Sequence, residues 1–124
     1  TLHLIKPLGF SIDEKSVRRA GLDYWKDVKI VMWENLDEFL EANKDKKIYF
    51  ATTKTNQKYS DVNYEENDFI MFGPESRGIP EDVLNRFKAN NITIPMLPIG
   101  RSLNLSNSVA IVLYEGLRQL GFNY

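Results

Sequence analysis

Short apolar runs rich in β-branched and aromatic residues alternate along the chain with stretches that have the period of an α-helix. Runs that are continuously apolar, rather than alternating, are typical of strands buried on both faces of a parallel sheet. We predict strands at residues 2–5, 28–33, 48–53, 68–72 and 92–95, with helices in the intervals. This order of elements indicates an α/β fold built on a parallel sheet.

Capping residues locate two of the helix starts. Asn35 and Glu38 have the spacing of a capping box, in which each side chain accepts a hydrogen bond from an exposed backbone N–H group. Pro80, followed by Glu81 and Asp82, predicts another start. Proline loses no hydrogen bond there, and acidic side chains favour the positive end of the helix dipole.

The last predicted helix, from about Ser106 to Leu120, is apolar over an unusually broad part of its surface. A single neighbouring element cannot cover so wide a face. Such a helix is either central in a domain or shared between two subunits, and this is the first indication of a homodimer. Its apolar residues are Val109, Ala110, Val112, Leu113, Gly116, Leu117 and Leu120.

Composition excludes several kinds of chemistry. The 124 residues have the length of a single domain, which we expect to span 1–124, and no apolar run approaches the roughly 20 residues of a membrane span. We therefore expect a soluble, cytoplasmic protein. The absence of cysteine excludes disulfides, thiolate nucleophiles and sulfur-ligated zinc. The single histidine, His3, cannot form a metal-binding cluster, so we predict no metal site and expect His3 to pack or to lie at the surface.

The formal net charge of -1 argues against a surface that binds nucleic acid over its whole extent. Local basic groups remain as candidates for phosphate contact if they converge on one surface, although each alone has the character of an ordinary solvated face. They are Lys15, Arg18 and Arg19, then Lys44, Lys46 and Lys47, and then Lys54 and Lys58.

Ligands in open α/β sheets bind beyond the carboxyl ends of the strands, so three loops are candidates for a shared site, at residues 52–54, 73–78 and 96–106. Neither the glycine pattern of dinucleotide-binding proteins nor that of the P-loop occurs in the sequence. The loops therefore do not predict a phosphate cradle.

The second loop begins with Gly73, directly after an apolar strand, where glycine lets the backbone approach a ligand closely. Gly78 and Pro80 fit an ordinary tight connection from strand to helix equally well. The charged pair of Glu75 and Arg77 adds weight to a functional role, in binding either a substrate or a second subunit.

The third loop places small polar residues between an apolar strand and an apolar helix, without any pair of nucleophile and base. Backbone and amide groups there can hydrogen-bond a purine beside an apolar slot. Ser106 or Asn107 can equally serve only as the N-cap of the last helix. The small or polar residues are Gly100, Ser102, Asn104, Ser106 and Asn107, and the apolar ones are Ile94, Met96, Leu97 and Leu103.

Three segments together resemble motifs of a known superfamily. Phe-Gly-Pro-Glu-Ser-Arg-Gly-Ile-Pro at 72–80, Ile-Pro-Met at 94–96 and Arg-Ser-Leu-Asn-Leu-Ser-Asn at 101–107 are similar to the second and third motifs of the SPOUT methyltransferases. Residues 7–10, 18–24 and 114–115 resemble the small tRNA (cytidine/uridine) 2'-O-methyltransferases that act at the wobble nucleotide. The resemblance extends over nearly the whole chain.

This resemblance implies a parallel-sheet α/β fold with a C-terminal trefoil knot, a homodimer, and a tRNA substrate. It also implies that S-adenosylmethionine binds in the knot, largely through backbone groups. The implied cofactor contacts are Ala51, Gly73, Glu75, Ile94, Met96, Ser102 and Leu103.

The implied reaction transfers a methyl group to a ribose 2'-hydroxyl, a weak nucleophile that needs orientation and removal of its proton. We expect Asn107 and Arg77 near this hydroxyl, with Tyr114 a weaker candidate. Their alternative roles are an N-cap, an interface pair and a core aromatic residue. The alternative functions are methylation of ribosomal RNA and a non-catalytic module that binds RNA or cofactor.

One motif of the superfamily has no counterpart here. Its members begin with a further strand and helix, and the connecting loop between them carries a first motif with an arginine often assigned to catalysis. Residues 1–5 resemble the second strand of the family. We therefore expect a domain that lacks the first strand-helix unit and is N-terminally incomplete.

Overall fold

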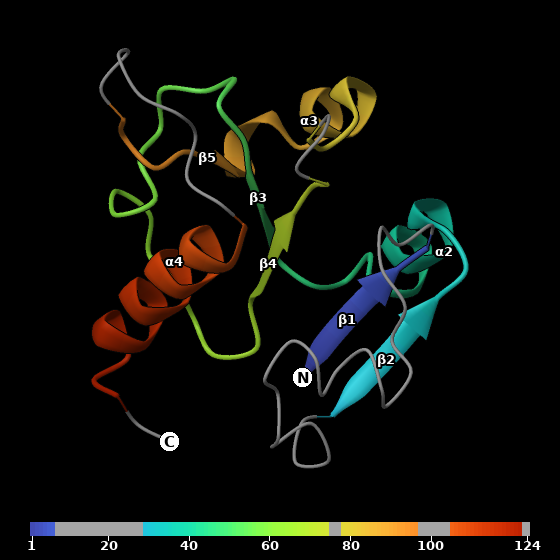
Figure 1. Ribbon diagram of the computed structural model, residues 1–124, viewed down its shortest axis with the longest axis horizontal. Helices are drawn as coiled ribbons and strands as arrows, with labels where there is room; N and C mark the ends of the chain where they lie inside the picture. The colour runs from blue at the N-terminus through green and yellow to red at the C-terminus, as the bar shows by residue number, and fades with distance from the viewer. Residues whose placement is uncertain (7–28, 75–77, 97–104, 123–124) are drawn as a thin grey trace. The chain divides into compact units, whose positions relative to one another are not determined.

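The computed structural model describes residues 1–6, 29–74, 78–96 and 105–122, and Figure 1 traces the elements along the chain. The chain forms two compact units, Thr1–Asp45 and Lys46–Tyr124. Both units contain parallel strands and at least one helix, which confirms the predicted parallel-sheet α/β class. The predicted knot depends on the path of residues 97–104, which lie outside the described residues.

The first unit contains a two-stranded parallel sheet. Strand β1 (Leu2–Ile5) pairs with strand β2 (Ile30–Trp33), with Leu2 opposite Ile30 and Ile5 opposite Trp33. Helix α2 (Leu36–Ala42) follows β2 and begins where the sequence predicts. The Asn35 side chain accepts a hydrogen bond from the backbone N–H of Glu38 at 2.8 Å, so this half of the capping box is confirmed.

An aromatic cluster joins the strands of this unit to its helix. His3 stacks on Trp33, and both rings make edge-on contacts with the buried Phe39 of α2. The indole Nε1 of Trp33 donates a hydrogen bond to His3 Nδ1 at 3.1 Å. Burial, aided by the N-terminal amine and Lys29, lowers the pKa of His3. The packing role predicted for His3 is confirmed, and its neutral form is favoured because Nδ1 acts as an acceptor.

The second unit is built around strand β3 (Ile48–Ala51). It pairs in parallel with β4 (Phe69–Phe72) on one side and with β5 (Asn91–Ile92) on the other, which gives the order β4-β3-β5 visible in Figure 1. Every predicted strand is present, although most are shorter than predicted. The short length of β5 follows from its neighbour, because Thr93 bridges to Lys58 instead of to β3.

Helices follow β4 and precede the C-terminus in this unit. They are α3 (Glu81–Arg86), the 3₁₀ turn η2 (Lys88–Asn90) and α4 (Leu105–Gln119). The prediction of a helix in the interval between β3 and β4 is wrong, since residues 52–68 contain none. This interval is rich in Thr, Asn, Ser and Asp, whose side chains compete for backbone hydrogen bonds and favour turns.

The core of this unit lies between the sheet and α4. Ile92 and Val112 are completely buried there, and Tyr49 and Tyr64 meet edge to face in the same cluster. Phe50, which is also completely buried, stacks instead on Phe87. Gly116 lies under the Tyr64 ring, where an added Cβ would be 3.7 Å from the ring. Glycine at 116 therefore allows the Tyr64 ring to come close to α4.

Only a narrow face of α4 is buried within the chain. Val112 and Gly116 are its buried residues, whereas Leu113 and Tyr114 are 47% and 57% exposed. The exposure of Tyr114 rules out a core aromatic role, which was the alternative considered for this residue. Of the two explanations for the broad apolar surface of α4, a fully central helix does not fit its exposed side.

Candidate functional site

The carboxyl ends of three parallel strands meet at one edge of the second unit. Ala51 ends β3 and lies between Phe72 of β4 and Ile92 of β5 in the strand register. Gly73 follows Phe72 directly, and Ile94 follows two residues after Ile92. The structure thus brings Ala51, Gly73 and Ile94 to the same edge, as expected from parallel strands.

The loop after β4 closes on its own backbone. A Cβ atom at Gly73 would lie 2.3 Å from the carbonyl carbon of Gly78 and 2.4 Å from the nitrogen of Ile79. Gly78 has a φ of +71°, and its N–H donates to the carbonyl of Pro74 at 2.8 Å. The tight turn is therefore sufficient to require glycine at 73, whether or not a ligand also approaches. Glu75 and Arg77, between these glycines, lie outside the described residues.

A salt bridge joins the loop after β3 to the start of α3. Lys54 Nζ lies 2.6 Å from Oε1 of Glu81, and this hydrogen bond lowers the pKa of Glu81. The backbone N–H of Lys54 donates to Thr52 Oγ1 at 3.1 Å, which forms a local turn. Three of the lysines that are candidates for phosphate contact, Lys44, Lys47 and Lys54, are therefore already paired with carboxylates.

Two of the predicted apolar contacts have different surroundings. The side chain of Ile94 is partly buried and packs against the core cluster of Tyr49, Tyr64, Ile92 and Val112. Met96 is 45% exposed. The other predicted members of this loop, Leu97, Ser102 and Leu103, lie outside the part of the chain that the structure describes, as do Gly100 and Asn104.

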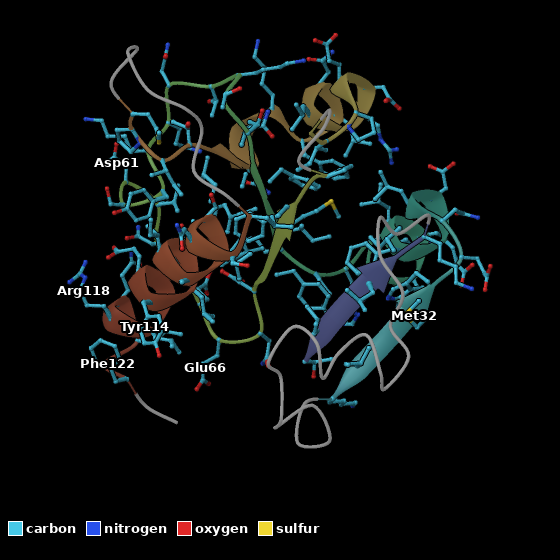
Figure 2. All side chains as sticks on the ribbon, viewed as in Figure 1. Met32, Asp61, Glu66, Tyr114, Arg118 and Phe122 are labelled. Carbon is cyan, nitrogen blue, oxygen red and sulfur yellow. The ribbon has the colours of Figure 1, made fainter. Side chains whose placement is uncertain are left out.

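Asn107 lies inside α4, not at its cap. The helix begins at Leu105, so Ser106 and Asn107 occupy its second and third positions, and the N-cap role considered for either one is wrong. Asn107 is exposed. Tyr114 lies two helical turns further along the same face, and Figure 2 shows it projecting from α4.

A hydrogen-bonded lock, which the sequence did not indicate, ties α4 to the connection between β3 and β4. The Gln119 amide donates to the carbonyl of Val62 at 2.9 Å and accepts from the N–H of Tyr64 at 2.9 Å. The Tyr64 hydroxyl donates to the carbonyl of Tyr59 at 2.6 Å. Burial, together with the nearby Tyr49 and Glu115, raises the pKa of Tyr64, so its hydroxyl keeps its proton as a donor.

Glu115 completes this lock on α4. Its carboxylate accepts two hydrogen bonds from Arg118, at 2.8 Å and 2.9 Å, and one from Gln119 at 2.8 Å. These bonds, with that from Arg118 first, lower the pKa of Glu115 to about 2. The ionised carboxylate thereby holds the Gln119 amide in the orientation that Val62 and Tyr64 require.

Two kinds of feature are absent from the part of the chain that the structure describes. It contains no group of three or more His, Cys, Asp or Glu side chains placed to hold a metal ion. Among the same described residues, no helix combines the length and the apolar character needed to cross a bilayer.

Comparison with known proteins matches the chain over nearly its full length. The model of the SpoU rRNA Methylase family matches residues 1–114. The tRNA (cytidine(34)-2'-O)-methyltransferase of Escherichia coli K12 is 45% identical over 122 residues, which are 98% of this chain and 78% of that protein.

Solved structures give the same result. A structure described as giving insights into 2-OH methylation of C/U34 on tRNA is 40% identical, with a TM-score of 0.88 over 98% of this chain and 80% of that one. An AdoMet-bound rRNA methyltransferase from Sinorhizobium meliloti has a TM-score of 0.77 at 23% identity, covering 95% of this chain and 45% of that one. At that identity the likeness concerns the fold alone.

Proposed function

We propose a function for this chain, which belongs to the SpoU rRNA methylase family. It is an S-adenosylmethionine-dependent tRNA 2'-O-ribose methyltransferase that acts at the wobble nucleotide. The observation that carries the proposal is the 45% identity to the E. coli enzyme over 98% of the chain. The convergence of Ala51, Gly73 and Ile94 at one sheet edge supports it independently.

The residues at this edge fit S-adenosylmethionine. Ala51 and Gly73 present almost no side chain there, so backbone groups are available to an adenine ring or a carboxylate. Met96 adds an exposed apolar side chain, and Ile94 a partly buried one. We propose that these four residues hold the cofactor. Glu75, Ser102 and Leu103, proposed from the family resemblance, complete the set.

The bound cofactor would supply a methyl group activated by a positively charged sulfur. The protein would then orient a ribose 2'-hydroxyl, which is a weak nucleophile, and the hydroxyl proton would pass to water as the oxygen takes the methyl group. In the proposal, Oδ1 of Asn107 accepts a hydrogen bond from the hydroxyl and so directs its oxygen. In the same proposal, Arg77 stabilises the charge that develops on this oxygen.

We further propose that a second copy of the chain covers the exposed side of α4. Leu113 and Tyr114 leave an apolar face on this helix, with Asn107 on the same side. A two-fold dimer through this face would bury it and place Asn107 near the interface. The C-terminal knot and a cytoplasmic location belong to the same proposal. Multi-angle light scattering of the wild-type chain tests the dimer, and a monomer at micromolar concentration contradicts it.

The direct test is methyl transfer to unmodified bulk tRNA from S-adenosylmethionine labelled in its methyl group, followed by mass spectrometry of the nucleosides. We expect label in 2'-O-methylcytidine or 2'-O-methyluridine. Label in a base contradicts the ribose assignment. Label only in a parallel reaction with ribosomal RNA supports the alternative substrate, and cofactor binding without any transfer supports a non-catalytic module.

Asn107→Ala tests the proposed orienting residue. Loss of one orienting hydrogen bond is expected to lower methyl transfer about 10- to 100-fold, while the unfolding temperature changes little because Asn107 is exposed. Ser108→Ala, in the same helical turn, is the control. Equal losses of activity and stability in Asn107→Ala indicate a structural role alone.

A further inference from the structure

Gln57 binds two backbone carbonyls with one side chain. It lies in the connection between β3 and β4, and its Nε2 donates to the carbonyl of Ala89 at 3.0 Å and to that of Asn91 at 2.9 Å. Both partners are acceptors, so the amide must present its nitrogen to them. We call these two hydrogen bonds the Gln57 fork. They span the junction where η2 ends and β5 begins.

The backbone around Gln57 continues this contact along the chain. The N–H of Thr93 donates to the carbonyl of Gln57 at 2.8 Å, and the N–H of Tyr59 donates to the carbonyl of Thr93 at 2.9 Å. Lys58 and Thr93 form the resulting parallel bridge. Residues 57–59 therefore run beside the strand that leads directly into Ile94 and Met96. We call residues 93–96 the cofactor arm.

The same junction is tied to the other loop of the site. The Nδ2 of the buried Asn91 donates to the carbonyl of Leu84 in α3 at 3.1 Å. Helix α3 begins just after the loop that closes between Gly73 and Gly78. The side-chain Oδ1 of Asn91 is buried and has no hydrogen-bond partner among the described residues. A buried oxygen without a hydrogen bond destabilises the conformation that buries it. The hydrogen bond from Gln57 to the backbone carbonyl of Asn91 helps to offset this cost.

We propose that Gln57 is a positioning residue that sets the conformation of the cofactor arm before the cofactor binds. The fork fixes the carbonyls of Ala89 and Asn91, and the carbonyl of Gln57 itself fixes Thr93. The cofactor arm is therefore held in one conformation before a ligand binds, and less conformational entropy is lost on binding. The link to S-adenosylmethionine rests on the proposed function, whereas the ordering of the arm does not.

The test compares the full-length wild type with Gln57→Ala, Gln57→Lys and Gln57→Glu. Alanine removes both donors, lysine keeps donor hydrogens on a long side chain, and glutamate turns acceptors toward the two carbonyls. Asn56→Ala, an exposed neighbour, is the control. Hydrogen exchange at the amides of residues 93, 94 and 96 is measured without cofactor, and affinity for S-adenosylmethionine is measured by calorimetry.

We expect about 10-fold faster exchange in the arm and about 10-fold weaker cofactor binding for Gln57→Ala. Gln57→Glu should be at least as impaired, with Gln57→Lys closer to the wild type. In turnover, KM for the cofactor should rise while kcat and KM for tRNA stay within about 2-fold.

Unchanged arm exchange in Gln57→Ala overturns the proposal, as does an equal loss of kcat and affinity with no recovery in Gln57→Lys. Failure of the wild type to bind S-adenosylmethionine overturns the proposed function instead. In that case, the exchange comparison still decides whether Gln57 orders the arm.

Discussion

Two connections reach the candidate site, and they are held by different means. The connection after β4 is closed by its backbone, with Gly73 lying against Gly78 and Ile79 too closely for any side chain. The connection after β3 is held by side chains, chiefly the amides of Gln57 and Gln119. The first closure tolerates no added atom, whereas the second can lose its bonds one at a time.

This difference predicts different responses to mutation. A Cβ atom forced against backbone must displace a whole segment, because no rotamer change relieves the clash. Loss of a hydrogen bond has a graded effect, of about 1 kcal/mol for each bond and more where a buried group is left without a partner. The free energy of unfolding of single variants therefore separates the two kinds of closure.

Gly73→Ala should have the largest effect, since its Cβ would lie 2.3 Å from a backbone carbon. We expect a loss of about 3 kcal/mol or more in the free energy of unfolding, measured by urea denaturation. Gly78→Ala is the matched control. It meets no atom within 4 Å but has a φ of +71°, so a loss of about 1 kcal/mol is expected. Equal losses in the two variants would contradict closure by backbone contact.

Gln119→Ala should have the next largest effect. It leaves the carbonyl of Val62 and the N–H of Tyr64 without their side-chain partner, and we expect a loss of about 2 kcal/mol. Tyr64→Phe removes only the bond to Tyr59 and should lose about 1 kcal/mol by the same urea measurement. If the free energy of unfolding falls less in Gln119→Ala than in Tyr64→Phe, the hydrogen bonds of Gln119 are not the main connection between α4 and residues 52–68.

Glu115→Gln should lose about 1 kcal/mol at pH 7, because it removes the charge that Arg118 and Gln119 contact. The pKa of Glu115 is lowered to about 2 in the folded protein, against roughly 4.3 in an unfolded chain. Its stabilisation is therefore complete above about pH 4.3 and is lost as the pH falls toward 2.

Urea denaturation at several pH values checks this assignment. The difference between the wild type and Glu115→Gln should shrink through that acid range. Glu66, labelled in Figure 2, is exposed, and Glu66→Gln serves as the control. A difference that does not depend on pH would contradict the electrostatic origin of the effect.

Lys54→Met should have the smallest effect, although it breaks a salt bridge between the two connections. Lys54 and Glu81 are 54% and 72% exposed, so water screens their attraction, and we expect no change in the free energy of unfolding that urea denaturation can resolve. NMR titration should show the pKa of Glu81 rising toward its ordinary value, because the hydrogen bond that lowers it is gone. If Lys54→Met lowers the free energy of unfolding as much as Gln119→Ala does, the salt bridge between Lys54 and Glu81 contributes strongly to stability, contrary to this prediction.

Much of the site was predictable, because it follows from strand ends. Apolar runs located β3, β4 and β5, and parallel pairing brings their carboxyl ends to one edge. The family resemblance then indicated Ala51, Gly73 and Ile94 at that edge. The locks that hold the edge were not predictable. Gln57 and Asn91 are 34 residues apart, and Gln119 and Val62 are 57 apart, so no local pattern marks them as partners.

The sequence by itself determined the elements whose cause is local. The Asn35 cap starts α2, the apolar runs form strands, and the turn-forming residues between β3 and β4 exclude a helix there, contrary to the alternation expected of the whole chain. Tertiary structure decided why Gly73 must be glycine and which side of α4 stays exposed. Those outcomes depend on contacts between backbone and side-chain groups that are far apart in the sequence, and no local sequence pattern indicates such contacts.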